Sequence, residues 1–221
     1  MAVKVVDPVT AESKRSARPD KTPNGPRAKK HPISDAVLLS VRQRALFDLW
    51  LACRNGKPMP ARQDVDVLDL KPWLGDLHML KAEGDGSDFR YLIFGTNIAQ
   101  YIGREMTGKL MSEAPEPRLA ALTIASYRRV WQTGIPHLIK RPSVVTGFRV
   151  QQAVRDYLVL PLGEDGVRVN RLMVLLELHR LGNATSDFVE FFPLDGKTAA
   201  YAHSVVDLER EFYPETPTGH P

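Results

Sequence analysis

The stretch from Leu77 to Gly95 reads LHMLKAEGDGSDFRYLIFG and contains two short runs rich in apolar and aromatic residues. The runs Leu77–Glu83 and Asp88–Gly95 each have the length of a strand, and the four residues 84–87, which include two glycines, separate them. Glycine adopts the positive φ angles that tight hairpin turns require. The stretch therefore predicts a β-hairpin, which would be the first part of a sheet.

The chain after this hairpin contains helical patterns and then three further strand-like segments. Apolar residues at helical spacing predict helices over Asn97–Ile102 and Pro117–Gln132. Strands are predicted over Pro136–Arg141, Arg149–Leu162 and Val167–His179. The order of two strands, a helical insertion and three strands predicts an α+β fold with five strands.

An amphipathic helix is predicted ahead of the hairpin, over Val37–Cys53, with Ser34 or Asp35 as its N-cap. Its apolar stripe is long for a peripheral helix and would otherwise need cover from the domain's own sheet. We therefore expect this helix to mediate homodimerisation, with Leu38, Leu46 and Trp50 at the centre of the interface. The competing interpretation is that the stripe packs only within its own subunit.

The composition changes along the chain and predicts three regions. Residues 1–32 hold eight Lys or Arg against three Asp or Glu and have almost no large apolar residues, which predicts a disordered basic tail. Residues 33–180 form the folded domain with its N-terminal helix. Residues 181–221 form an extension that packs in part, with a helix expected near Thr198–Phe212 and a loose end.

The bulk properties of the sequence favour a cytoplasmic protein. The longest largely apolar run, Leu172–Leu178, is far shorter than the roughly 20 residues of a membrane-spanning helix, and residues 2–9 do not resemble a secretory signal. The single cysteine, Cys53, cannot form an internal disulfide, which agrees with a reducing compartment. The net charge of +4 belongs to the tail, because the remaining residues contain 22 basic and 23 acidic side chains.

Several landmarks of the sequence resemble the PAS fold, and within it a bacterial group of stand-alone PAS-like proteins. They are Trp50-x-x-x-Arg54-x-Gly56 with Pro60-x-Arg62-x-Asp64, Tyr91-x-x-x-Gly95-Thr96, Gly103-Arg104-Glu105 with Gly108, and Arg155-Asp156-Tyr157 with Pro161-Leu162. They cover about residues 42–178. The resemblance implies a five-stranded antiparallel sheet with helices on one face, often around a small cavity. It also implies a protein that senses or binds and rarely catalyses.

The residues argue against the commoner cofactors of this fold and against catalysis. A flavin photosensor needs a thiol beside the flavin, but Cys53 lies on the N-terminal helix. The candidate haem ligands His78, His137 and His179 all lie on predicted strands, where a surface or hydrogen-bonded histidine is the better interpretation. Histidine and acidic residues show no metal-ligand spacing, and no serine nucleophile motif is present. We therefore expect no catalytic residue, no metal, no cofactor and a colourless protein.

Arginines on adjacent strands are the most suggestive polar group of the sequence. Guanidinium groups beside a sheet-lined cavity would bind a carboxylate or a phosphate through two parallel hydrogen bonds, and nearby tyrosines would supply aromatic or hydroxyl contacts. The alternative is a solvated sheet edge. The expected ligand-binding residues are Tyr91, Tyr101, Tyr127, Arg141, Arg149, Arg155 and Tyr157.

The sequence favours a non-catalytic sensory or regulatory protein. Such a protein would bind a small molecule or a protein partner and would signal through dimerisation or docking of its N-terminal helix. The alternative function is a nucleic-acid-associated regulator that uses the basic tail, since its eight cations could neutralise phosphates. That alternative is weaker because the tail lacks interleaved aromatic residues and the folded part has no recognition-helix pattern.

Overall fold

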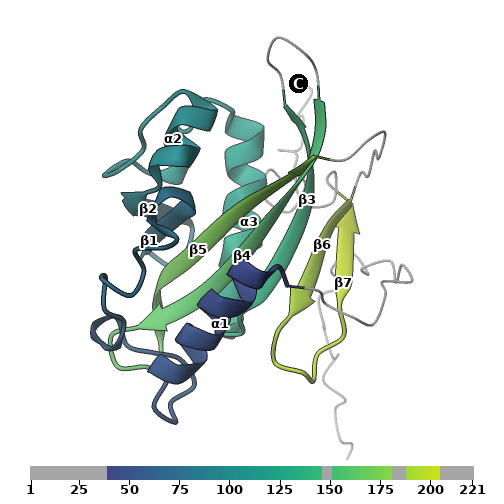
Figure 1. Ribbon diagram of the computed structural model, residues 1–221. Helices are drawn as coiled ribbons and strands as arrows, with labels where there is room; N and C mark the ends of the chain where they lie inside the picture. The colour runs from purple at the N-terminus through teal and green to yellow at the C-terminus, as the bar shows by residue number, and fades with distance from the viewer. Residues whose placement is uncertain (1–38, 146–150, 181–187, 205–221) are drawn as a thin grey trace, which may run out of the picture.

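The computed structural model describes residues 39–145, 151–180 and 188–204, which form a seven-stranded sheet with helices on both of its faces (Figure 1). The sheet order is β2-β1-β5-β4-β3-β6-β7, and every neighbouring pair is antiparallel. The strands are β1 (Leu77–Glu83), β2 (Asp88–Phe94), β3 (His137–Val145), β4 (Gln151–Gly163), β5 (Val169–Arg180), β6 (Phe188–Pro193) and β7 (Tyr201–Ser204).

The prediction of five strands is wrong in number, because the C-terminal extension adds β6 and β7 to the sheet. β6 pairs with β3 along its free edge and buries Val189 and Phe191 completely. The helix expected near Thr198–Phe212 is therefore wrong for Tyr201–Ser204, which is a strand, and its part beyond Ser204 lies outside the described residues. An unpaired edge of β3 favours strand addition over a helix, because it offers open hydrogen-bonding groups.

The three α-helices are divided between the two faces of the sheet. α1 (Val41–Cys53) lies in front of the sheet in Figure 1, whereas α2 (Thr96–Ile102) and α3 (Pro117–Thr133) cover the other side. One apolar core lies between the sheet and the helices α2 and α3, and a second core lies between the sheet and α1. The predicted α+β class is confirmed, and the central strands are covered on both faces.

The start of α1 differs from the predicted start because the cap is Ser40, not Ser34 or Asp35. The Gln43 amide donates to the Ser40 hydroxyl, and the Ser40 amide donates to the Gln43 side chain, so the two residues form a capping box. The buried face of the helix carries Gln43, Leu46, Phe47 and Trp50 at helical spacing.

This burial corrects the predicted dimer interface. Leu46 and Trp50 pack against the chain's own sheet, where they are 0% and 1% exposed, and the Trp50 indole donates to the Pro161 carbonyl at 2.9 Å. These two side chains are not free to contact a second copy. Leu38 lies outside the described residues, and homodimerisation through another surface stays a prediction.

The outer edge of β2 is covered by the loop that follows α2. The Tyr91 amide donates to the Lys109 carbonyl at 3.0 Å, and the Gly108 amide donates to the Tyr91 carbonyl at 2.7 Å. Gly108 has a φ of 81°, which a residue with a side chain rarely adopts. The landmark Gly108 therefore turns this loop against the strand.

Two predictions concern residues that the structure does not describe. The basic tail, residues 1–32, and most of the C-terminal end lie outside the described ranges.

Among the described residues, no helix is both long enough and apolar enough to cross a membrane.

Candidate functional site

Two arginines face each other inside the fold, on the β3–β4 hairpin. Arg141 of β3 lies directly opposite Arg155 of β4, and both share a sheet face with Tyr157, which contributes to the core beneath α2 and α3. Arg141 is only 2% exposed and Arg155 is half-buried. Like charges directly across a strand pair destabilise the pairing, so this juxtaposition has an energetic cost.

The Arg141 side chain is held at one end and unpartnered at the other. Its Nη1 donates to the Thr123 hydroxyl of α3 at 2.9 Å, and its guanidinium carbon lies 4.9 Å from the centre of the Tyr157 ring. Its Nε and Nη2 are buried and have no hydrogen-bond partner within the part of the chain that the structure describes. A buried cation without a counter-charge costs several kcal/mol, so this group is unusual for a purely structural residue.

Arg155 is covered by a tyrosine from α2. Its Nη2 donates to the Tyr101 hydroxyl at 3.2 Å, and its guanidinium carbon lies 5.3 Å from the centre of the Tyr101 ring. Its Nε is buried and has no partner among residues 39–145, 151–180 and 188–204. Arg155 thus links the sheet to α2 at the edge of the apolar core.

The tyrosines beneath the helices respond to the two cations. Burial raises the pKa of Tyr127 and of Tyr91. Burial would also raise the pKa of Tyr157, but the charges of Arg141 and Arg155, together with a hydrogen bond from Arg155, outweigh burial and lower that pKa. The site therefore carries a positive potential that favours an anionic group.

Six of the seven predicted ligand-binding residues lie on the side of the sheet that α2 and α3 cover. The Tyr127 and Tyr157 ring centres are 6.2 Å apart, while Tyr91 lies further along the core in edge contact with Phe94 at 4.9 Å. Arg149 lies outside the described residues. The alternative of a solvated sheet edge is wrong for Arg141, because that side chain is buried.

His78 is a buried polar residue whose position the sequence analysis misjudged. It is 5% exposed, and its ring centre lies 4.5 Å from that of Phe94 and 5.4 Å from that of Tyr91. No described residue forms a hydrogen bond with its Nδ1. Burial lowers its pKa to about 3. Its place in the apolar core could have been inferred from the alternation of β1, in which His78 and Leu80 share a face.

The other predicted haem-ligand candidates have different surroundings. His137 is buried, its Nδ1 lies 2.8 Å from the Ile135 carbonyl, and its Nε2 lies 3.3 Å from the Tyr201 hydroxyl. His179 is on β5, but its side chain lies outside what the structure describes. Within the described ranges, no three His, Cys, Asp or Glu side chains lie together as metal ligands would.

The acidic residues next to this site in sequence lie on the opposite face of the sheet. Asp156, between Arg155 and Tyr157, points toward the α1 side and lies 3.8 Å from the Lys140 ammonium. Its cross-strand neighbour Glu177 lies 3.8 Å from the Arg42 guanidinium. Each of these two carboxylates therefore has a cation beside it.

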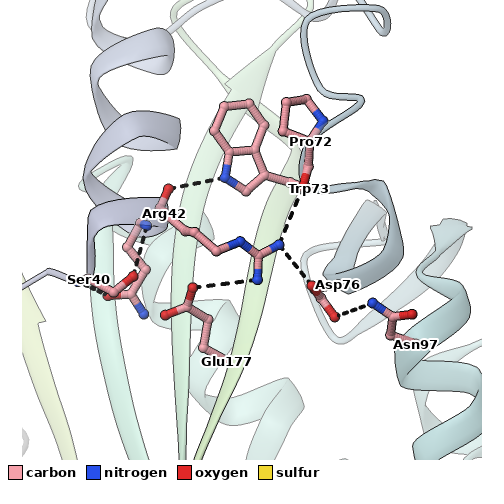
Figure 2. A network of polar contacts seen from close by, with 8 residues as sticks. Ser40, Arg42, Pro72, Trp73, Asp76, Asn97 and Glu177 are labelled. Carbon is pink, nitrogen blue, oxygen red and sulfur yellow. Dashed lines mark hydrogen bonds and ion pairs between the residues drawn. The ribbon is translucent and has the colours of Figure 1, made fainter.

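Arg42 connects α1 to α2 through this polar cluster (Figure 2). Its Nη2 lies 2.8 Å from Asp76, and the Asn97 amide of α2 donates to the same carboxylate at 2.9 Å. Figure 2 shows Arg42 between Asp76 and Glu177, with Trp73 beside it. The Trp73 indole donates to the Arg42 carbonyl at 3.1 Å, which fixes the first turn of α1.

A pocket of about 370 Å³ opens where β5 continues past the start of β1. Residues of α1, α2 and β5 line it, together with the 3₁₀ turn Leu74–Asp76. The lining residues are Arg42, Asp76, Asn97, Ile98, Tyr101, Leu176, Glu177 and Leu178. Leu178 lies opposite Arg155 in the sheet, and Tyr101 covers Arg155, so the pocket ends beside Arg155.

Comparison with known proteins agrees with the fold. A family model described as a PAS domain matches residues 39–175, which is more than half of the chain. No curated protein and no solved structure matches the chain. The matched range contains α1, α2, α3 and the strands β1 to β4, and it ends within β5. Domains of this kind have, in general terms, sensory and regulatory roles. The chain belongs to the PAS domain family.

Proposed function

We propose that this chain is a non-catalytic cytoplasmic regulatory protein whose PAS core binds a small molecule and passes the bound state to α1. The observation that carries the proposal is a set of polar contacts at both ends of one turn of α2, which connects the core to that helix. Arg155 contacts Tyr101, which lies one helical turn after Asn97 on α2, and Asn97 contacts Asp76, which pairs with Arg42 of α1.

The strength of these contacts suits a reversible response. Arg42 and Asp76 have side chains that are 46% and 23% exposed, so their ion pair contributes no more than roughly 1 kcal/mol. A difference of that size shifts a two-state equilibrium about fivefold. A displacement of α2 could therefore alter how firmly the first turn of α1 is held without unfolding the domain.

A protein partner or a second copy would receive this change at the outer side of α1. Val41 is 88% exposed and Leu51 is 39% exposed on that side, whereas the inner side packs on the sheet. These two side chains are the apolar groups of α1 that a docked partner would contact. Homodimerisation through this outer side is part of the proposal.

Hydrogen–deuterium exchange of the α1 amides tests the proposal, because it reports local opening directly. The variant Tyr101→Ala removes the contact between α2 and Arg155. We expect exchange in residues 43–50 to accelerate about fivefold, because Asn97 and Asp76 would hold Arg42 less firmly. The matched control is Ile102→Ala, the next residue of the same helix, whose side chain is 37% exposed.

The two variants separate a relay from a general loosening of α2. Ile102→Ala should leave α1 exchange within twofold of the wild-type rate. If Tyr101→Ala leaves α1 exchange as slow as Ile102→Ala does, the core does not pass its state to α1 by this route and the proposal is wrong.

A further inference from the structure

We propose that Arg141 and Arg155 together bind the oxyanion group, a carboxylate or a phosphate, of a small ligand. The inference names the ligand class of the sensory function proposed above and rests on it in that respect. It concerns the buried side of the β3–β4 hairpin and the pocket that ends at Tyr101.

The first argument is the missing counter-charge. The two arginines are cross-strand partners, and within the described residues neither side chain forms an ion pair with an Asp or Glu. On the other face of the same strands, Asp156 and Glu177 are also opposite each other, and both have a cation within 3.8 Å. Among the described residues, the two carboxylates on one face each have a counter-charge, whereas the two arginines on the other face have none. A bound anion would supply that counter-charge.

The second argument is the geometry of the free donors of Arg141. The bond from Nη1 to Thr123 occupies one end of the guanidinium group and fixes its orientation. The unpartnered Nε and Nη2 form the adjacent edge, whose two N–H groups are parallel. That edge matches the spacing of two oxygens in a carboxylate or a phosphate. On the facing strand, Arg155 has a buried Nε that also lacks a partner among the described residues.

The third argument is the route from solvent. The pocket of about 370 Å³ has apolar side chains, Ile98 and Leu176, on the wall that continues into the core. Tyr101 lies between this pocket and Arg155, and its hydroxyl accepts one hydrogen bond of 3.2 Å from Arg155. Rotation of the Tyr101 side chain would expose Arg155, and the pocket would then hold the apolar part of a ligand whose oxyanion reaches past Arg155 to Arg141.

Titration calorimetry with three simple probes tests the site. Sodium phosphate, sodium acetate and sodium hexanoate are added at constant ionic strength to the full chain, to Arg141→Met and to the control Arg104→Met, whose side chain is exposed. At least one probe should bind the wild type with a Kd of 10 mM or below, on the order expected for a few hydrogen bonds from a small anion. Arg141→Met should weaken that binding at least roughly tenfold, because it removes the paired donors, whereas Arg104→Met should change it less than about twofold.

The probes also identify the source of the oxyanion. Tighter binding of hexanoate than of acetate indicates a carboxylate with an apolar body, whereas tighter binding of phosphate than of both indicates a phosphate ester. Circular dichroism of Arg141→Met ensures that lost binding is not lost folding. If that variant is unfolded, the side-chain Nε–H resonance of Arg141 in the wild-type nuclear magnetic resonance spectrum gives a second measurement, and the bound anion should shift it.

Two results would overturn the inference. One is that none of the three probes binds the wild type or shifts the Arg141 resonance. The other is that Arg141→Met binds a probe as tightly as the wild type, which would show that Arg141 serves only to pack over Tyr157. Neither result bears on the exchange of the α1 amides, so the site and the relay can fail separately.

Discussion

His78 occupies a position where a neutral imidazole is required. Its ring contacts those of Phe94 and Tyr91, which also contact each other, in the core beneath α2, and it is 5% exposed. Burial lowers its pKa to about 3, far below the usual value of 6.5. The residue is thus neutral in the folded protein at every pH at which the protein would be handled.

This pKa predicts a loss of stability in mild acid. Below pH 6.5 the unfolded chain takes up a proton at His78, while the folded chain does not until about pH 3. Proton uptake by the unfolded state alone lowers the free energy of unfolding as the pH falls, by about 1.4 kcal/mol per pH unit within this window. Between pH 7 and pH 5 the contribution of His78 should be about 2 kcal/mol.

Urea unfolding of the wild type and of His78→Phe at pH 7 and pH 5 measures this contribution. The phenyl ring keeps the stacking on Phe94 and removes the titrating group. From pH 7 to pH 5, the free energy of unfolding of the wild type should fall by about 2 kcal/mol more than that of the variant. Equal losses in the two proteins would show that His78 does not titrate as its burial requires.

The residues of the arginine site could be predicted from the sequence, but the charge balance of the site could not. The sequence predicts Arg141 and Arg155 as ligand-binding residues because they lie on strand-like segments with tyrosines nearby. The neighbouring acid Asp156 faces the other side of the sheet, and this depends on which residues of β3 and β4 are paired. A shift of one residue in that pairing would reverse the two faces, and no local pattern determines it.

At the scale of elements, α1 is a helix as predicted, but the side predicted to form a dimer interface is the side that packs on the sheet. Its end at Cys53 was predicted, and the capping box of Ser40 and Gln43 gives its true start. The apolar stripe predicts an interface because the sequence does not show that the sheet has a second uncovered face. The addition of α1 to that face buries Leu46 and Trp50 among residues of β1, β4 and β5.

The burial of α1 predicts that Leu46→Glu unfolds the domain and does not simply dissociate an oligomer. Leu46 is 0% exposed, so the variant would place an unpaired charge in the core and remove apolar packing, at a cost of at least about 3 kcal/mol. Circular dichroism and urea unfolding measure the loss, and sedimentation velocity gives the oligomeric state.

The control for this variant is Val41→Glu on the exposed side of the same helix, where the side chain is 88% exposed. It should change the stability by less than about 0.5 kcal/mol. A Leu46→Glu protein that is folded and monomeric, beside a dimeric wild type, would contradict this prediction and support the interface expected from the sequence.

At the scale of the whole molecule, the folded unit extends past the range that matches the PAS family. That match ends at residue 175, yet β6 and β7 continue the sheet as far as Ser204. Val189 and Phe191 of β6 belong to the core beneath α2 and α3. The sequence signal for these strands is weak because β6 is short and β7 has only four residues.

The strand β6 should therefore be essential for stability. Val189→Asp places a charge at a position that is 0% exposed and should cost about 3 kcal/mol. For a domain of this size that cost corresponds to a melting temperature lower by roughly 6–12 °C. Glu190→Gln, on the adjacent residue of the same strand, should leave the melting temperature within about 2 °C of the wild type. An unchanged melting temperature for Val189→Asp would show that the strands after β5 are accessory.

The loop that covers the outer edge of β2 bears on how the protein behaves at high concentration. Exposed edge strands are templates on which other chains add strands, and this leads to aggregation. In this molecule Gly108 and Lys109 already bond to Tyr91 of β2, and Arg90 and Leu110 form a further bridge beside them. The opposite edge of the sheet, β7, is only four residues long. One edge of the sheet is thus covered and the other edge strand is short, so the fold resists aggregation by edge-to-edge strand addition.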